Sequence, residues 1–411
     1  MSLTRITAGR LADGTGAPIV ENAAILIDGE RIVAVGPAAS VPTPEGAETF
    51  EFPTQTLIPG LVDCHSHLNL PGDGTTIEGA AADGDDIALL RSAENARLTL
   101  RSGVTTLRDN GAMNRTTFSI KEALRRKIIT GPRLSISGRP ITMTGGHCWP
   151  FGGEADGVEA VRQSVRQMIK EGADWLKMMA TGGGTLNTLP YRPSYTVAEL
   201  RAGVEEAHQA NRLAAAHCSC TAGMVNALDA GFDMIIHGNF HAPDGTFLFD
   251  RDVAKRIADQ GVWVNPTLHV NRVRMWRLER ISQERALTDA ETADLELNRR
   301  RYRERQQNMQ GLQAAGVKLV AGSDSGWSFY RFGDFVHEVE AMASAGLGPA
   351  KAFQAATLES ARSMGVDREV GSLEPGKLAD LLLVDGDPTV DVGALSKVVA
   401  VWLGGQRTTW P

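Results

Sequence analysis

Cysteine and long apolar runs are scarce in this 411-residue chain, and each scarcity excludes a class of protein. The four cysteines, Cys64, Cys148, Cys218 and Cys220, are too irregularly spaced for a disulfide framework, so we expect reduced thiols. No apolar run is long enough to cross a bilayer, and residues 1–6 lead into a Gly- and Asp-rich stretch rather than the apolar core of a signal peptide. These absences predict a cytoplasmic protein with no membrane partner.

An excess of positive charge is also missing. The chain has 42 Lys and Arg residues against 49 Asp and Glu residues, a formal net charge of -7, and no dense basic run. A nucleic-acid partner would need a basic surface, so we expect none. The apolar share of 42% is ordinary for a globular protein, and the length suits one large domain with a smaller one.

The two ends of the chain share a β-rich pattern. Residues 23–36 contain two strand-like runs around Asp28-Gly29, which is a strong hairpin signal, and residues 371–387 and 398–403 also have the pattern of strands and turns. Neither end has enough apolar residues for a core of its own. We therefore predict that residues 1–58 and 371–411 pair into one small β-sandwich domain.

Between the ends, strand-like and helix-like stretches alternate. The eight candidate strands are residues 57–63, 104–109, 133–138, 175–181, 213–218, 234–238, 262–268 and 318–323. Apolar residues at three- and four-residue steps predict helices between them, as at 85–101, 157–171, 196–211 and 251–260. This alternation predicts an α/β fold, a (β/α)8 TIM barrel over residues 59–370. An open doubly wound sheet is disfavoured because no Gly-x-Gly-x-x-Gly turn follows an early strand.

Residues 272–310 form the longest connection and are rich in Arg, Glu and Leu. We interpret this stretch as a lengthened, solvated helix with i,i+4 ion pairs. A lid over the barrel mouth or an oligomer contact is the alternative.

Reactive side chains stand at the predicted strand ends, where barrel enzymes place their active sites. The first strand ends in Asp63-Cys-His65-Ser-His67, and alternate residues of an extended segment point the same way. A pair of neutral imidazoles suits a transition-metal ion. His65 and His67 are therefore candidate metal ligands.

Other strand ends carry Lys177, His217, His237 and Asp324. An ammonium group inside an apolar strand costs several kcal/mol unless it is paired or neutralised. A carboxylate partner would meet this need. The alternative is a neutral Lys177 that reacts with carbon dioxide and gives an anionic carbamate able to bridge two cations.

The segment Gly60-Leu-Val-Asp-Cys-His-Ser-His67 and the order His-x-His, Lys, His, His, Asp resemble the amidohydrolase superfamily, in its binuclear form. Residues 371–387 resemble its closing segment. The resemblance implies that His65, His67 and Asp324 hold one ion, that His217 and His237 hold the other, and that carbamylated Lys177 bridges them. Zinc is the default metal, with manganese, cobalt and iron as alternatives.

The resemblance also implies the reaction. Two cations would acidify a shared water, so that a metal-bridging hydroxide attacks an amide-type carbonyl. Asp324 would accept the proton and pass it to the leaving nitrogen.

Residues 140–147 and 177–183 are similar to imidazolonepropionase-related proteins and metal-dependent Xaa-Pro dipeptidases. This likeness implies a small-molecule substrate, a dipeptide or N-acyl amino acid, and a homo-oligomer. His147 would contact the substrate carbonyl or the tetrahedral intermediate. Residues 184–195 and 217–220 depart from the pattern, so aryl ureas, carbamates and cyclic amides stay open as substrates.

Further pocket residues are expected from their positions. Tyr191 and Arg192 are candidates for binding a substrate carboxylate, and His269 and Asn265 follow or end the seventh strand. A more apolar pocket is the alternative, and its candidate lining residues are Trp149, Phe151, Trp327 and Phe329. A non-catalytic assembly protein would show gaps in the ligand set, and this sequence has none.

Overall fold

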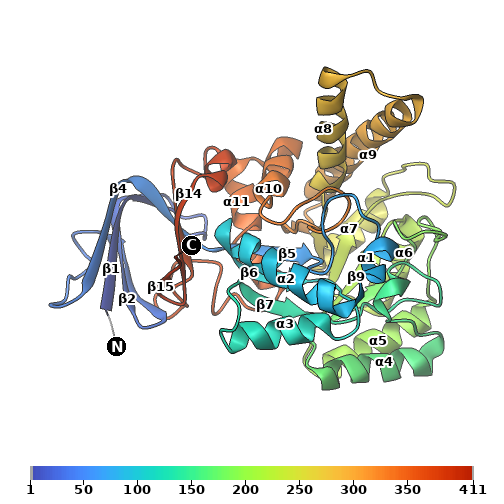
Figure 1. The fold of residues 1–411 in the computed structure, drawn as a ribbon, viewed down its shortest axis with the longest axis horizontal. Coiled ribbons are helices and arrows are strands. Elements are labelled where there is room, and N and C mark those ends of the chain that lie inside the picture. Colours follow the sequence, from blue (N-terminus) through green and yellow to red (C-terminus); the bar gives the residue numbers. More distant parts are fainter. Residues whose placement is uncertain (1–2, 410–411) are drawn as a thin grey trace.

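The two ends of the chain form one mixed sheet in the computed structural model, which describes residues 3–409. Its strand order is β15-β14-β13-β4-β1-β2-β3 (Figure 1). The strands are β1 (Leu3–Leu11), β2 (Val20–Asp28), β3 (Arg31–Pro37), β4 (Glu48–Pro59), β13 (Leu381–Val384), β14 (Val398–Leu403) and β15 (Gln406–Arg407). The predicted hairpin is confirmed, since Asp28 pairs with Arg31.

This sheet has its own apolar core. Ile6, Ile25, Leu57, Leu381 and Trp402 are buried together. They come from both ends of the chain, so neither end buries its apolar face without the other. The hydrogen bonds connect the seven strands into a single sheet, and a second layer is not assigned among the described residues.

The middle of the chain forms two parallel sheets, so the predicted α/β class is confirmed. One contains β5 (Leu61–Ser66), β6 (Val104–Asp109) and β7 (Arg133–Ile136). The other has the order β12-β11-β10-β9-β8, with bounds β8 (Leu176–Met179), β9 (Ala214–Cys218), β10 (Met234–His237), β11 (Trp263–Asn265) and β12 (Lys318–Leu319). Two isolated parallel bridges, Ile141 to Met178 and Ser66 to Ser325, join the two sheets at both edges.

Helices follow most of these strands, and Figure 1 shows them around the parallel strands. Their bounds are α1 (Ile77–Ala82), α2 (Gly84–Arg101), α3 (Thr116–Arg125), α4 (Gly157–Glu171), α5 (Val197–Gln209), α6 (Thr221–Ala230), α7 (Arg251–Asp259), α8 (His269–Glu284), α9 (Asp289–Ala314), α10 (Val336–Met342), α11 (Pro349–Ala355) and α12 (Leu358–Ser363), with short turns at Trp149–Phe151, Ala343–Leu347 and Val392–Ser396. No helix in residues 3–409 combines the length and apolar composition needed to cross a membrane.

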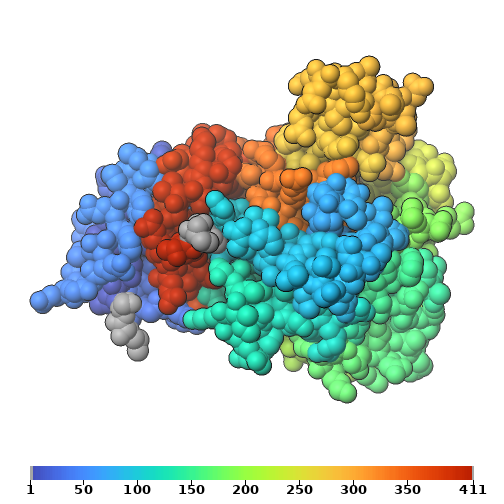
Figure 2. Space-filling model, viewed as in Figure 1, coloured from blue at the N-terminus to red at the C-terminus, as the bar shows by residue number. Residues whose placement is uncertain are grey.

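Two elements that the sequence predicted as single are divided in the structure. The predicted strand 57–63 is divided, because Leu57 pairs with β1 and β13 in the mixed sheet whereas β5 begins at Leu61. The predicted single helix over 272–310 is wrong. It is a hairpin of α8 and α9, and a capping box of Thr288 and Glu291 begins the second helix. This hairpin stands out from the rest of the surface (Figure 2).

The mixed sheet contacts the parallel strands through a two-bond ion pair. Arg133, at the start of β7, donates to both carboxylate oxygens of Asp380, over 2.6 and 3.0 Å. Asp380 is buried and also accepts the backbone N–H of Gly404 over 2.7 Å. Because the pair is bidentate, it holds the start of β13 in one orientation against β7.

We expect Trp402→Ala to destabilise the protein by about 3–5 kcal/mol, because it removes a fully buried side chain. The indole packs edge-on against Phe50 and Phe52, at 5.7 and 6.1 Å between ring centroids. Urea denaturation followed by circular dichroism measures the loss. Val390→Ala, at a 72% exposed position, is the control and should shift stability by no more than about 0.5 kcal/mol. Equal effects of the two substitutions would contradict the proposed role of Trp402.

Candidate metal centre

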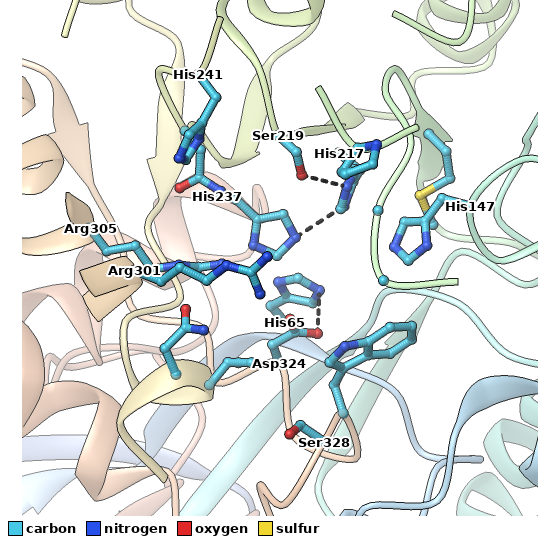
Figure 3. Close-up of a pocket in the computed structure, with 18 of the residues that line it drawn as sticks. His65, His147, His217, Ser219, His237, His241, Arg301, Arg305, Asp324 and Ser328 are labelled. Carbon is cyan, nitrogen blue, oxygen red and sulfur yellow. Dashed lines mark hydrogen bonds and ion pairs between the residues drawn. The ribbon is translucent and has the colours of Figure 1, made fainter. Parts of the chain in front are cut away.

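A cavity of about 360 Å³ opens where the parallel strands end. Its walls come from the ends of β5, β8, β9 and β10, from the loops after β7 and β12, and from α8 and α9 (Figure 3). The side chains that face it are mostly polar and include His65, His67, His147, Lys177, Tyr191, His217, Ser219, His237, Asn239, His241, Arg274, Arg301, Glu304, Arg305, Asp324 and Trp327.

At one side of the cavity two imidazoles converge on one carboxylate. His65 Nδ1 lies 2.9 Å from Asn265 Oδ1, and His67 Nδ1 lies 2.8 Å from the Gly111 carbonyl oxygen. Both oxygens only accept, so each Nδ1 carries the proton and each Nε2 presents a lone pair. These Nε2 atoms lie 3.2 and 3.4 Å from Asp324 Oδ1. Three buried acceptors therefore face one another, and a bound cation would satisfy them.

A second convergence involves His217 and His237. His237 Nδ1 lies 2.6 Å from Thr267 Oγ1, whose own proton goes to the Pro266 carbonyl oxygen at 2.8 Å. His237 Nδ1 is therefore the donor, and its Nε2 lone pair points at His217 Nδ1, 3.0 Å away. His217 Nε2 lies 3.1 Å from the Gly182 carbonyl oxygen, which accepts, and 3.1 Å from Ser219 Oγ, which donates or accepts, so both tautomers of His217 have partners. In the tautomer of His217 protonated at Nε2, two lone pairs face each other across this gap.

Burial keeps these histidines neutral, as metal ligands must be. It lowers the pKa of His67 and of His147 to about 3. Burial also lowers the pKa of His65, His217 and His237 well below the usual value. Burial has the opposite effect on Asp324 and raises its pKa to about 6, although the positive charge of Lys177 acts to lower it. The donor set of imidazoles and one carboxylate fits a divalent transition metal.

Lys177 lies inside this group of acceptors. Its side chain is only 1% exposed, and among residues 3–409 it makes no hydrogen bond and no ion pair within 4 Å. Burial lowers the pKa of Lys177 to about 8, while the Asp324 carboxylate acts in the opposite direction. The ammonium form therefore predominates at pH 7, with about one-tenth of the side chain present as the neutral amine.

The structure brings His147 and Tyr191 into the cavity, as expected from the sequence. The His147 ring lies 4.5 Å from the His217 ring, and its Nδ1 lies 2.8 Å from Thr185 Oγ1. The Tyr191 ring lies 4.9 Å from the ring of His241.

The positions expected for Arg192 and His269 are corrected. Arg192 is exposed and does not line the cavity, because the loop turns there, with its N–H bonded to the Leu189 carbonyl oxygen. His269 is buried at the start of α8, where its ring packs on Tyr330 at 4.6 Å. Its Nδ1 accepts a hydrogen bond from Arg272, so this ring supports the hairpin.

Asn265 lies behind His65 rather than in the cavity, and its buried amide orients that ligand. Among the four predicted aromatic residues, Trp327 lines the cavity, whereas Trp149, Phe151 and Phe329 do not.

Sequence reasoning favoured a solvated helix over a lid for residues 272–310, and it named no residue of α8 and α9, other than His269, for the cavity. Arg274, Arg301, Glu304 and Arg305 line the cavity, although they lie in the segment interpreted as solvated. Arg301 and Arg305 are four residues apart and therefore share a helix face. That spacing was visible in the sequence, but α9 contains many Arg and Glu residues and nothing local shows which face meets the cavity.

Comparisons with a family model, with curated proteins and with solved structures all find amidohydrolases or related hydrolases. The model of the amidohydrolase family matches residues 56–408. Ochratoxinase from Aspergillus niger is 28% identical over 449 aligned residues, which cover all of this chain and 87% of that protein. A solved Xaa-Pro dipeptidase with methionine bound in its active site is 26% identical, with a TM-score of 0.85 over 99% of this chain and 100% of the other. A prolidase complexed with N-methylphosphonate-L-proline is 27% identical, with a TM-score of 0.84 over 99% of both chains.

In the metal-free protein we expect His67 to stay neutral, with its proton on Nδ1, from pH 8 down to pH 5. Its folded-state pKa is about 3, below the usual 6.5. The unfolded chain therefore binds the proton first, and the His67 contribution to the free energy of unfolding falls as the pH drops from 6.5 toward 3. Nitrogen-15 NMR of histidine-labelled protein measures the protonation state. An imidazolium signal from His67 at pH 5.5 would contradict this.

Proposed function

The chain belongs to the amidohydrolase family and is a hydrolase acting on C–N bonds, and from this premise we propose that it cleaves the amide bond of a dipeptide, such as Xaa-Pro, or of an N-acyl amino acid. The observation that supports a metal-dependent reaction is the meeting of unprotonated imidazole nitrogens with Asp324 in one buried cavity. Neutral His65 and His67, with their protons on Nδ1, offer no donor to the Asp324 carboxylate, and a divalent cation would satisfy all three groups.

The proposal includes the architecture that positions the site. The eight parallel strands would close into a (β/α)8 barrel, with the bridges Ile141 to Met178 and Ser66 to Ser325 as its two seams. The mixed sheet of both chain ends would fold into a β-sandwich, with boundaries at residues 1–58, 59–370 and 371–411. The separate apolar core of that sheet supports this division.

Two divalent ions, with zinc as the first candidate, would occupy the site. His65, His67 and Asp324 would hold one, His217 and His237 the other, and Lys177 would bridge them as a carbamate. The unpaired, partly neutral amine of Lys177 supports the carbamate, because only the neutral form reacts with carbon dioxide. When bound, the ions would polarise the scissile carbonyl and acidify a water molecule.

The side chains around this centre have separate tasks in the proposed reaction. Asp324 accepts the proton of the attacking water and returns it to the leaving nitrogen. His147 donates a hydrogen bond to the substrate carbonyl oxygen. Thr185 Oγ1 supports this role, because it accepts from the Cys148 N–H and can donate its own proton to His147 Nδ1, which leaves the ring proton on Nε2.

The lining of the cavity favours a polar substrate over an aryl urea or carbamate. Three of the four aromatic residues that would make the pocket apolar lie elsewhere, and charged and amide side chains take that space. A non-catalytic assembly role is disfavoured because no residue of the ligand set is missing. The homo-oligomer and the cytoplasmic location stay predictions.

Metal-loaded protein should hydrolyse N-acyl amino acids and dipeptides such as Xaa-Pro, and should leave aryl ureas and carbamates intact. A chelator should abolish this activity, and added zinc, manganese or cobalt should restore it. A substrate panel with amine detection measures both effects. Activity confined to ureas or carbamates would overturn the substrate proposal.

Native mass spectrometry of the same samples tests the metal centre itself. We expect two ions and one added carbon dioxide per chain. A loaded, active enzyme without the added carbon dioxide would remove the bridging role of Lys177.

Asp324→Asn should lower kcat by at least about 100-fold and change KM much less, because the amide cannot accept a proton from water. Steady-state kinetics and elemental analysis of bound metal give the result. Asp86→Asn, at an exposed carboxylate on α2, is the control and should behave as the parent protein does. An Asp324→Asn protein that keeps its metal and a near-normal kcat would refute the proton-transfer role.

A further inference from the structure

Two arginines of α9 extend toward the cavity beside the candidate metal ligands. Arg301 and Arg305 both line it, and Figure 3 shows them reaching inward near His237 and Asp324. We propose that Arg301, supported by Arg305, binds the free carboxylate of the amino acid released by hydrolysis, so that the α8–α9 hairpin selects substrates with a C-terminal carboxylate. This inference rests on the proposed function and names its anion subsite.

Arg305 is fixed in place by the backbone next to the metal site. Its Nη1 donates to the Pro266 carbonyl oxygen at 3.2 Å, to the Thr267 carbonyl oxygen at 2.6 Å and to Thr267 Oγ1 at 2.8 Å. The same hydroxyl orients His237. Among residues 3–409 no carboxylate lies within 4 Å of this guanidinium, so its positive charge is not neutralised.

Arg301 lies one helical turn before Arg305, at the open edge of the cavity. Among the described residues its guanidinium makes no hydrogen bond and no ion pair, whereas the guanidinium groups of nearby arginines pair with carboxylates. Arg274 pairs with Asp294 at 2.8 Å, and Arg299 pairs with Glu279 at 2.9 Å. The guanidinium of Arg301 is therefore available, with donors in the fork geometry that matches a carboxylate.

The neighbouring acidic residue does not neutralise this pair. The two carboxylate oxygens of Glu304 contact other side chains, His241 Nε2 at 3.4 Å and Arg300 Nε at 3.7 Å. Like charges four residues apart on a helix destabilise each other. An anion held between Arg301 and Arg305 would remove that repulsion, so this wall of the cavity is suited to a negatively charged group.

The position of this pair matches a carboxylate close to the scissile bond. In a dipeptide or N-acyl amino acid, a single carbon separates the leaving nitrogen from the carboxylate. With the carbonyl at the metal ligands, the carboxylate must lie close to them, because only the nitrogen and the α-carbon separate the two groups. Arg305 is adjacent to the ligand His237 through Thr267, and Arg301 is one turn farther out. A neutral urea or carbamate would leave both guanidinium groups unpaired.

Arg301→Gln tests the subsite with two matched substrates, N-acetyl-L-leucine and N-acetyl-L-leucinamide, which differ only in the carboxylate. For the acid, we expect KM to rise about 10- to 100-fold with kcat within a few-fold, as for loss of a hydrogen-bonded ion pair. For the amide, no change is expected. Arg301→Lys should restore part of the loss. Arg303→Gln, at an exposed position of α9 outside the cavity, is the control and should match the parent protein.

Calorimetric binding of L-leucine and L-leucinamide gives a second measure that does not depend on turnover. Arg301→Gln should weaken L-leucine about 10- to 100-fold, without a matching effect on L-leucinamide. An equal change for both ligands, or none for the acid, would overturn the subsite. If no dipeptide or N-acyl amino acid of the substrate panel is hydrolysed, the proposed function fails, and the calorimetry still decides whether Arg301 binds a carboxylate.

Discussion

The rest of the site depends on one constraint, which is the close approach of buried hydrogen-bond acceptors at the ends of the parallel strands. His65 and His67 present unprotonated nitrogens to Asp324, and His237 presents one to His217. Burying such groups without a donor costs free energy, so the fold must compensate for it. A bound cation would do so, which would link the stability of this region to the reaction proposed for it.

Each ring is held by a partner that determines which nitrogen faces the cavity. For His65 and His67 these partners are the Asn265 amide and the Gly111 carbonyl. For His237 the partner is Thr267 Oγ1. Oriented partners of this kind fix the tautomer and the angle of a metal ligand. The site is therefore built from the loops behind the ligands as much as from the ligands themselves.

The α8–α9 hairpin joins the metal side and the substrate side of the cavity. The buried carboxylate of Glu338 accepts the backbone N–H groups of Leu268 and His269 at 2.8 and 2.7 Å, which holds the start of α8. Arg305 holds the preceding turn from α9. The same hairpin that supports Thr267, and through it His237, thus also presents Arg301 to the substrate. The α8–α9 hairpin protrudes from the surface, yet it supports a candidate metal ligand and contributes to the proposed substrate subsite.

The sequence by itself determined the α/β class, the paired chain ends and the strand-end positions of the candidate ligands. These follow from local periodicity, since alternate residues of a strand share a face and a parallel strand must end at the cavity edge. Only the tertiary structure decided that Arg301 faces the cavity while Arg192 faces solvent and His269 packs under α8. Those orientations depend on contacts between segments far apart in the chain, and no local pattern in the sequence encodes them.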